Sequence, residues 1–145
     1  MRFFSTLTAG LASLAATVVS AQTLSFGTPQ NSTQVIPGEE VLVSVFQGDT
    51  NSQFADVAIA LGIALCNGAC PGTGPDAGLV DVFYSGPFVT TSVPGSSARF
   101  QNFTVTVPSF FEAGQNAQVT AALFTLTGAV GIPVLETIAV VLEIV

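Results

Sequence analysis

Bulky and small residues alternate along one stretch near the middle of the chain, from Phe54 to Cys66. Its odd positions are bulky and aliphatic, namely Val57, Ile59, Leu61, Ile63 and Leu65. The positions between them are small, namely Ala58, Ala60, Gly62 and Ala64. Because successive side chains of a strand point to opposite faces, this period of two predicts a central β-strand. We expect the odd face to enter a core and the Ala/Gly face to let another layer or loop approach closely.

Shorter segments of the same period precede and follow this stretch, and turns rich in Gly, Pro, Asn and Ser separate them. The expected further strands are residues 24–28, 41–47, 79–84, 88–92, 98–107 and 118–127, and a last one after the turn at 128–133. About seven to eight short alternating strands without a helical period predict an all-β fold, a single immunoglobulin-like β-sandwich.

The same alternation predicts which side chains of three strands face the core. The expected inward sets are Val41, Val43 and Val45; Phe103, Val105 and Val107; and Ile138, Val140, Leu142 and Ile144. Asn102, Thr104, Thr106 and Glu143 fall on the opposite faces. The Gly- and Pro-rich segment from Cys66 to Gly78 is expected to form a loop at the end of the sandwich.

The first 21 residues have the features of a secretory signal peptide. Arg2 precedes an apolar run that ends at Val19-Ser20-Ala21, with small residues at the −3 and −1 positions of a cleavage site after Ala21. Ser, Thr and Gly residues interrupt the run, which makes a transmembrane anchor the weaker interpretation. We therefore expect a secreted, extracellular protein, with residues 22–145 as its one domain.

Charge restricts the partners of this domain. Residues 22–145 contain one cation, Arg99, and nine carboxylates, which gives a formal charge of −8. Nucleic acids and anionic membranes attract cationic patches, so neither is an expected partner. We expect a monomer without membrane insertion.

The inventory of reactive side chains argues against catalysis. Without His or Lys in residues 22–145 there is no Ser-His-Asp triad, no Schiff base and no imidazole metal site. Asp49 with Asp56, or Asp76 with Asp81, could still supply the two carboxylates of a glycosidase, but the chain has no Trp to stack on a sugar. The segment from Asp49 to Gln53 begins like a calcium loop and lacks its Gly and distal Glu. We expect no enzyme activity, no cofactor and no metal.

Cys66 and Cys70 are the only cysteines of the chain and lie four positions apart. A redox pair usually has two intervening residues, and a metal would need further ligands. In a secreted chain this spacing favours a local disulfide that pins the loop. Closing so short a loop stabilises the fold by about 2 kcal/mol at most, so we expect the fold to survive reduction.

Two sequons and one aromatic pair are the remaining candidate sites. Asn31 and Asn102 each begin an Asn-X-Ser/Thr sequence and are expected glycan acceptors. Phe110 and Phe111 are adjacent, so one of them should face outward; they form a candidate contact patch, with edge packing as the alternative. Phe100 lies on the opposite face of its strand from Phe103, and it is also expected to be exposed.

Three stretches occur in a particular order and spacing: Pro37-Gly38 opening a hydrophobic strand, DVAIALG from Asp56, and ALFTLTGA from Ala122 followed by Pro133. Together they resemble the fungal necrosis-inducing secreted protein (Nis1) effector family, over essentially all of residues 22–145. Cys66, Cys70 and the loop around them have no counterpart in the family pattern.

The resemblance implies a small secreted β-sandwich that works by binding. It implies suppression of plant pattern-triggered immunity through binding of immune receptor-like kinases, and induction of cell death by some members. The implied place of action is the host apoplast, or the host cell after uptake. It supplies no catalytic residues. Two alternatives come from the composition: a structural or adhesive cell-surface protein, and a carbohydrate-binding module, which would want a planar row of exposed aromatic rings.

Overall fold

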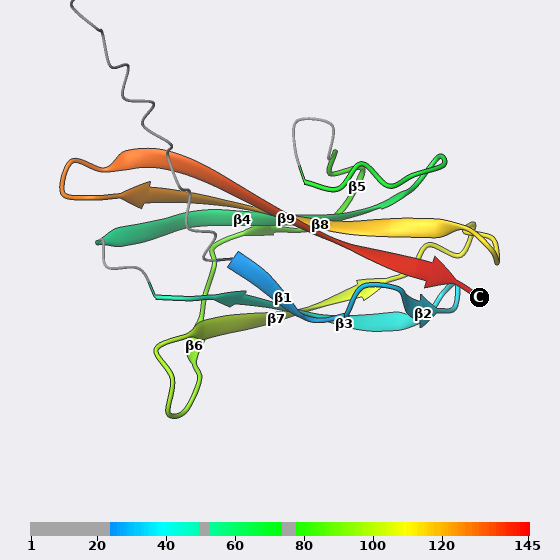
Figure 1. Ribbon diagram of the computed structural model, residues 1–145, viewed down its shortest axis with the longest axis horizontal. Helices are drawn as coiled ribbons and strands as arrows, with labels where there is room; N and C mark the ends of the chain where they lie inside the picture. The colour runs from blue at the N-terminus through cyan, green and yellow to red at the C-terminus, as the bar shows by residue number, and fades with distance from the viewer. Residues whose placement is uncertain (1–23, 50–52, 74–77) are drawn as a thin grey trace, which may run out of the picture.

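The computed structural model describes residues 24–49, 53–73 and 78–145, which form nine strands and no helix (Figure 1). The strands are β1 (Leu24–Thr28), β2 (Thr33–Val35), β3 (Glu40–Gln47), β4 (Phe54–Leu65), β5 (Asp81–Gly86), β6 (Thr91–Ser92), β7 (Arg99–Thr106), β8 (Asn116–Thr127) and β9 (Ile132–Ile144). Within these ranges no helix is long and apolar enough to cross a membrane. The predicted signal peptide, residues 1–21, lies outside the described residues.

The strands form two facing sheets, which confirms the predicted all-β sandwich (Figure 1). One sheet has the order β1-β3-β7-β6 and the other the order β2-β9-β8-β4-β5. All neighbours pair antiparallel except β2 and β9, which run parallel. In immunoglobulin notation these are the ABED sheet and the GFC sheet extended by C′, so the topology is immunoglobulin-like.

The core lies between the sheets and is mainly aliphatic. The predicted inward faces of β3, β7 and β9 are confirmed, because the following residues are buried: Val43, Val45, Phe103, Val105, Val107, Ile138, Val140, Leu142 and Ile144. The outward side chains Asn102, Thr104 and Thr106 are exposed, also as predicted. Each fully buried side chain of this kind contributes about 1.5–3 kcal/mol to stability.

Val57, expected on the core face of β4, is exposed. The pairing of β4 with β8 shifts register between Asp56 and Ala58, so Val57 is an extra residue that forms a β-bulge. The bulge reverses the facing of the strand. Asp56 points between the sheets before it, and the odd residues from Ile59 to Ile63 do so after it.

The segment after β4, expected at the end of the sandwich, folds back over the outer face of the five-stranded sheet. Two hydrogen bonds hold it there: Gly72 N–H donates to Gln118 Oε1 (2.8 Å), and Gln118 Nε2 donates to the Gly72 carbonyl (3.0 Å). A Cβ at Gly62 would lie 3.2 Å from the Leu79 Cα, so the small residue permits the approach. The Ala/Gly face of β4 thus accommodates a loop, as its composition predicted.

Three short elements differ from the expectation. β2 was not among the predicted strands, and it forms three parallel pairs with the end of β9. The strand expected over residues 88–92 is reduced to β6, which contains only Thr91 and Ser92. Phe88 lies outside this strand, and its side chain is buried in the core. β5 begins at Asp81 rather than Leu79, because the residues before it belong to the loop that covers β4.

Candidate functional site

Three connections meet at the end of the sandwich where β4 ends and β8 begins. They are residues 36–39 before β3, residues 66–73 after β4, and residues 107–115 between β7 and β8. Backbone hydrogen bonds tie each of them to neighbouring segments; for example, Val107 N–H donates to the Glu39 carbonyl (2.9 Å). We call this region the disulfide end. It brings together the predicted disulfide and the predicted aromatic pair.

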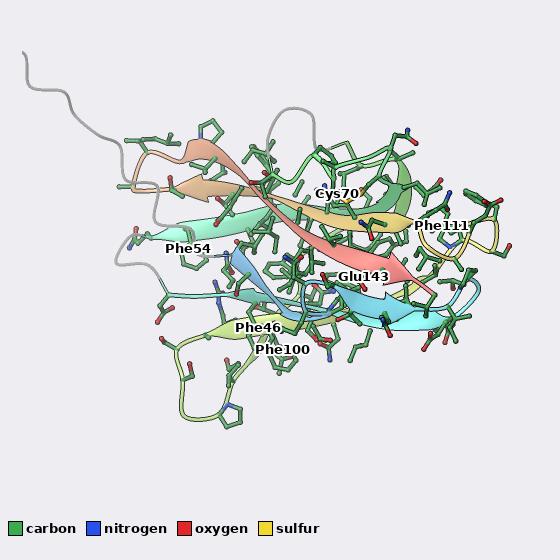
Figure 2. All side chains as sticks on the ribbon, turned by 45° about the vertical axis from the view of Figure 1, so that its right-hand side comes forward. Phe46, Phe54, Cys70, Phe100, Phe111 and Glu143 are labelled. Carbon is green, nitrogen blue, oxygen red and sulfur yellow. A yellow bond between two sulfur atoms is a disulfide. The ribbon has the colours of Figure 1, made fainter. Side chains whose placement is uncertain are left out.

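The aromatic pair divides between the surface and the core. Phe110 is 69% exposed, whereas Phe111 is 4% exposed and belongs to the core. Their rings meet edge to face with centroids 5.1 Å apart. Burial removes Phe111 from the predicted contact patch and leaves Phe110 as its exposed member. In Figure 2, Phe111 lies at the opposite end of the molecule from Phe54.

The surface of the disulfide end is both apolar and acidic. Ile36 is exposed in addition to Phe110, and so are the carboxylate residues Glu39, Glu40 and Glu112. An exposed aromatic ring and exposed carboxylates at the same end fit a partner surface that combines an apolar pocket with basic residues. This arrangement can bind a protein.

Cys66 and Cys70 form the predicted disulfide, with a Cα–Cα distance of 4.8 Å. The bridged loop and the outer face of the sheet enclose a cleft of about 310 Å³, lined mainly by apolar residues that include Ala64, Pro71 and Val80. No ionisable side chain that still titrates lies among its described lining residues. The cleft can take up an apolar side chain.

Reduction of the disulfide is expected to lower the free energy of unfolding by about 2 kcal/mol at most, because the closed loop is so short. The strands should persist, since the hydrogen bonds between Gly72 and Gln118 hold the segment independently of the sulfur atoms. Urea unfolding and far-ultraviolet circular dichroism with and without dithiothreitol measure both quantities. Loss of the β spectrum on reduction alone would contradict this expectation.

The two sequons lie outside the disulfide end and on exposed residues. Asn31 Oδ1 accepts a hydrogen bond from Val141 N–H (2.9 Å), which attaches the β1–β2 turn to β9. Asn102 Oδ1 accepts one from the Ser44 hydroxyl (2.6 Å) on the outer face of the four-stranded sheet. Both bonds involve the side-chain oxygen of the Asn and not its amide nitrogen, the atom to which a glycan would attach. Glycosylation of Asn31 and Asn102 stays a prediction.

A polar cluster that the sequence did not indicate joins the two sheets near the start of β4. Gln47 Nε2 donates to Asp56 Oδ1 (2.8 Å), and the Arg99 guanidinium donates to Gln47 Oε1 (2.9 Å). Arg99 also lies 3.7 Å from Asp56 Oδ2 and stacks over the Phe54 ring, with its guanidinium carbon 4.7 Å from the centroid. The only cation of residues 22–145 is therefore used inside the protein. We call these four residues the bridging cluster.

The carboxylates that were candidates for a catalytic pair lie in different surroundings. Asp56 is engaged by Gln47 and Arg99, whereas Asp49 is exposed, and Asp76 lies outside the described residues. Within the described ranges no three Cys, Asp or Glu residues are grouped so that they could hold a metal ion. The predicted absence of a metal and of catalysis stays a prediction.

A second aromatic pair lies on the outer face of the four-stranded sheet. Phe46 and Phe100 stack with ring centroids 5.3 Å apart and an interplanar angle of 19° (Figure 2). Both rings are half-buried, so Phe100 is less exposed than expected. Gly27 makes room for them, because a Cβ there would collide with the Phe46 ring.

Comparisons with known proteins identify a family. The chain matches the model of the Nis1 family over residues 19–143. No curated protein matches it. Among solved structures it is similar to a superoxide reductase (neelaredoxin) from Ignicoccus hospitalis, with 12% sequence identity and a TM-score of 0.45 over 83% of this chain and 80% of that chain. A likeness of this strength carries no argument about function.

Proposed function

The chain belongs to the Nis1 family, and from this membership we propose that it is a secreted, effector-like fungal protein that acts by binding other proteins. The family match over residues 19–143 is the observation that carries the proposal, and it agrees with the resemblance of three separate stretches of sequence. The proposed partners are plant immune receptor-like kinases, and the proposed effect is suppression of pattern-triggered immunity. Induction of necrosis belongs to the same proposal.

The disulfide end is the proposed contact surface. Phe110 supplies an exposed aromatic anchor, and aromatic residues are enriched at protein interfaces relative to the rest of the surface. Exposed Glu39, Glu40 and Glu112 surround this end with negative charge. Basic residues on the partner would raise the association rate, and salt would lower it. We propose that the protein lowers kinase activity by occupying a surface, without modifying the kinase.

The proposal predicts that Phe110→Ala weakens binding to the kinase portion of an immune co-receptor by about tenfold or more, because truncation of an interface anchor typically costs about 2 kcal/mol or more. The matched control is Val130→Ala, which removes an 84% exposed apolar side chain from the β8–β9 turn at the other end of the sandwich. Biolayer interferometry at two salt concentrations measures both variants. The control should bind like the unchanged protein.

Two results would contradict the proposal. One is no binding to any immune kinase at tens of micromolar, together with an intact plant immune burst. The other is capture by cell-wall polysaccharide but not by host membrane extract, which would support the structural or carbohydrate-binding alternative. Equal loss of binding in Phe110→Ala and Val130→Ala would move the contact away from the disulfide end.

A further inference from the structure

β7 has an edge that is mostly without a partner strand. On one side it pairs with β3 along its whole length, from Arg99 to Thr106. On the other side it pairs with β6 only at Arg99 and Phe100. Among the described strands none pairs with residues 101–106 on that side, and we call this segment the open edge.

The backbone groups that face the open edge can be identified. Just after β7, both the N–H and the carbonyl of Val107 bond to residues 38–39, on the side of β3. Because the backbone groups of successive residues in a strand alternate in direction, those of Asn102, Thr104 and Thr106 face the open edge. The side chains of these three residues are exposed as well. The open edge therefore presents three N–H donors and three carbonyl acceptors.

The open edge lacks the features by which proteins usually prevent another chain from pairing with an edge strand. Such features are prolines, charged side chains and β-bulges. Residues 101–106 contain no proline and no charged residue. The pairing of β7 with β3 and β6 has no register shift, so it contains no β-bulge.

The other partly unpaired edges do carry such features. The part of β9 that β2 does not cover contains Pro133 and Glu136. The part of β4 that β5 does not cover contains Asp56 and the bulge at Val57. The pairing of β1 is interrupted between Phe26 and Thr28. The absence of these features therefore distinguishes β7 from β9, β4 and β1.

We propose that the open edge binds an extended segment of a partner protein by β-strand addition, with a basic residue of that segment near Thr106. Unpaired donors and acceptors in strand geometry are complementary to an extended backbone. Glu40 lies opposite Thr106 on β3, and Glu39 precedes it; both are exposed. The formal charge of −8 in residues 22–145 opposes a second copy of the chain as the occupant.

The inference rests on the proposed function, because the open edge would be a second contact for the partner protein that binds the disulfide end. The open edge also contains the sequon that begins at Asn102, whose side chain is exposed beside it. A glycan on Asn102 would crowd the added strand, so we expect glycosylated protein to bind the segment more weakly. Glycosylation would then control access to this edge.

Amide hydrogen exchange with a synthetic strand tests the inference. The probe is the capped peptide Lys-Thr-Val-Thr-Val-Thr-Lys, added to isotope-labelled, unglycosylated protein and followed by NMR. In the free protein the amides of Asn102, Thr104 and Thr106 should exchange rapidly and those of Phe103 and Val105 slowly. The peptide should slow the first three. A twin peptide that is N-methylated at alternate residues should bind about tenfold more weakly or worse, since it cannot form the ladder.

Four results would overturn the inference. Slow exchange of the three amides in dilute free protein would mean that the edge is already covered. Equal binding of the methylated twin would exclude a backbone ladder. Protection that rises with protein concentration without peptide would make a second copy the occupant. Equal binding of a peptide with Glu in place of both Lys residues would show that the basic residue near Thr106 plays no part in binding. The experiment contains no kinase, so its failure is distinct from a failure of the proposed function.

Discussion

Replacing Phe111 with alanine is expected to lower the free energy of unfolding by about 3–5 kcal/mol, the usual cost of removing a buried Phe side chain. Phe111 is 4% exposed and packs into the core from the connection between β7 and β8. A domain of this size has a total stability of about 5–15 kcal/mol, so the loss is a large part of it. Urea unfolding followed by circular dichroism measures the change as a lower midpoint.

Phe110→Ala is the matched control, because it removes the same side chain from the neighbouring position. Phe110 is largely exposed, so its replacement should cost less than about 1 kcal/mol, including its edge contact with Phe111. The two variants separate the two roles of this segment: Phe111 stabilises the end of the core, and Phe110 is available to a partner. Similar destabilisation by both replacements would show that Phe110 is buried in solution, and it would remove the proposed anchor.

The alternation of residue types predicted most of the fold because each strand buries one face. The alternate residues from Val41 to Val45, from Phe103 to Val107 and from Ile138 to Ile144 are aliphatic or aromatic, and these side chains meet in a single core. The outward facing of Asn102 followed from the same rule. Where the period was uninterrupted, the sequence was sufficient to assign both the strand and its facing.

The alternation failed where pairing partners override it. Val57 continues the period of β4, yet the bulge turns it outward and turns Asp56 inward. Nothing in the local sequence marks this bulge, because its reason lies on other strands: Gln47 and Arg99 provide the partners that allow a carboxylate between the sheets. Arg99 is the only Lys or Arg of residues 22–145, among nine carboxylates, and this was the available signal that it has a specific partner.

The candidate site could be predicted in its parts and not in its arrangement. The spacing of Cys66 and Cys70 predicted their disulfide, and the pair of adjacent Phe residues predicted that one would face outward. The position of the disulfide loop depended on two distant features, the small residues of β4 and the side chain of Gln118. The open edge of β7 also had no local signal, since it results from the shortness of β6.

The bridging cluster gives the second large expected effect. Arg99→Met removes the guanidinium and leaves the Asp56 side chain, which is 11% exposed, without its cation, while Gln47 Oε1 loses its donor. Hydrogen bonds to charged groups contribute about 1.5–3 kcal/mol, and we expect a loss in that range. Asp56→Asn keeps the shape and the hydrogen bond from Gln47, so it should cost less, about 1 kcal/mol.

A double-mutant cycle assigns the effect to the ion pair. If Arg99 acts mainly through Asp56, the double variant Arg99→Met, Asp56→Asn should be less destabilised than the sum of the single variants, with a coupling of about 0.5–1.5 kcal/mol. The Arg99 side chain is 32% exposed, so solvent screens the pair and the coupling should stay below the value for a fully buried pair. Urea unfolding of the four proteins at low and high salt gives the coupling and its screening. Strict additivity would mean that the guanidinium stabilises the fold through Gln47 and the Phe54 ring, and that the carboxylate of Asp56 is held by Gln47 alone.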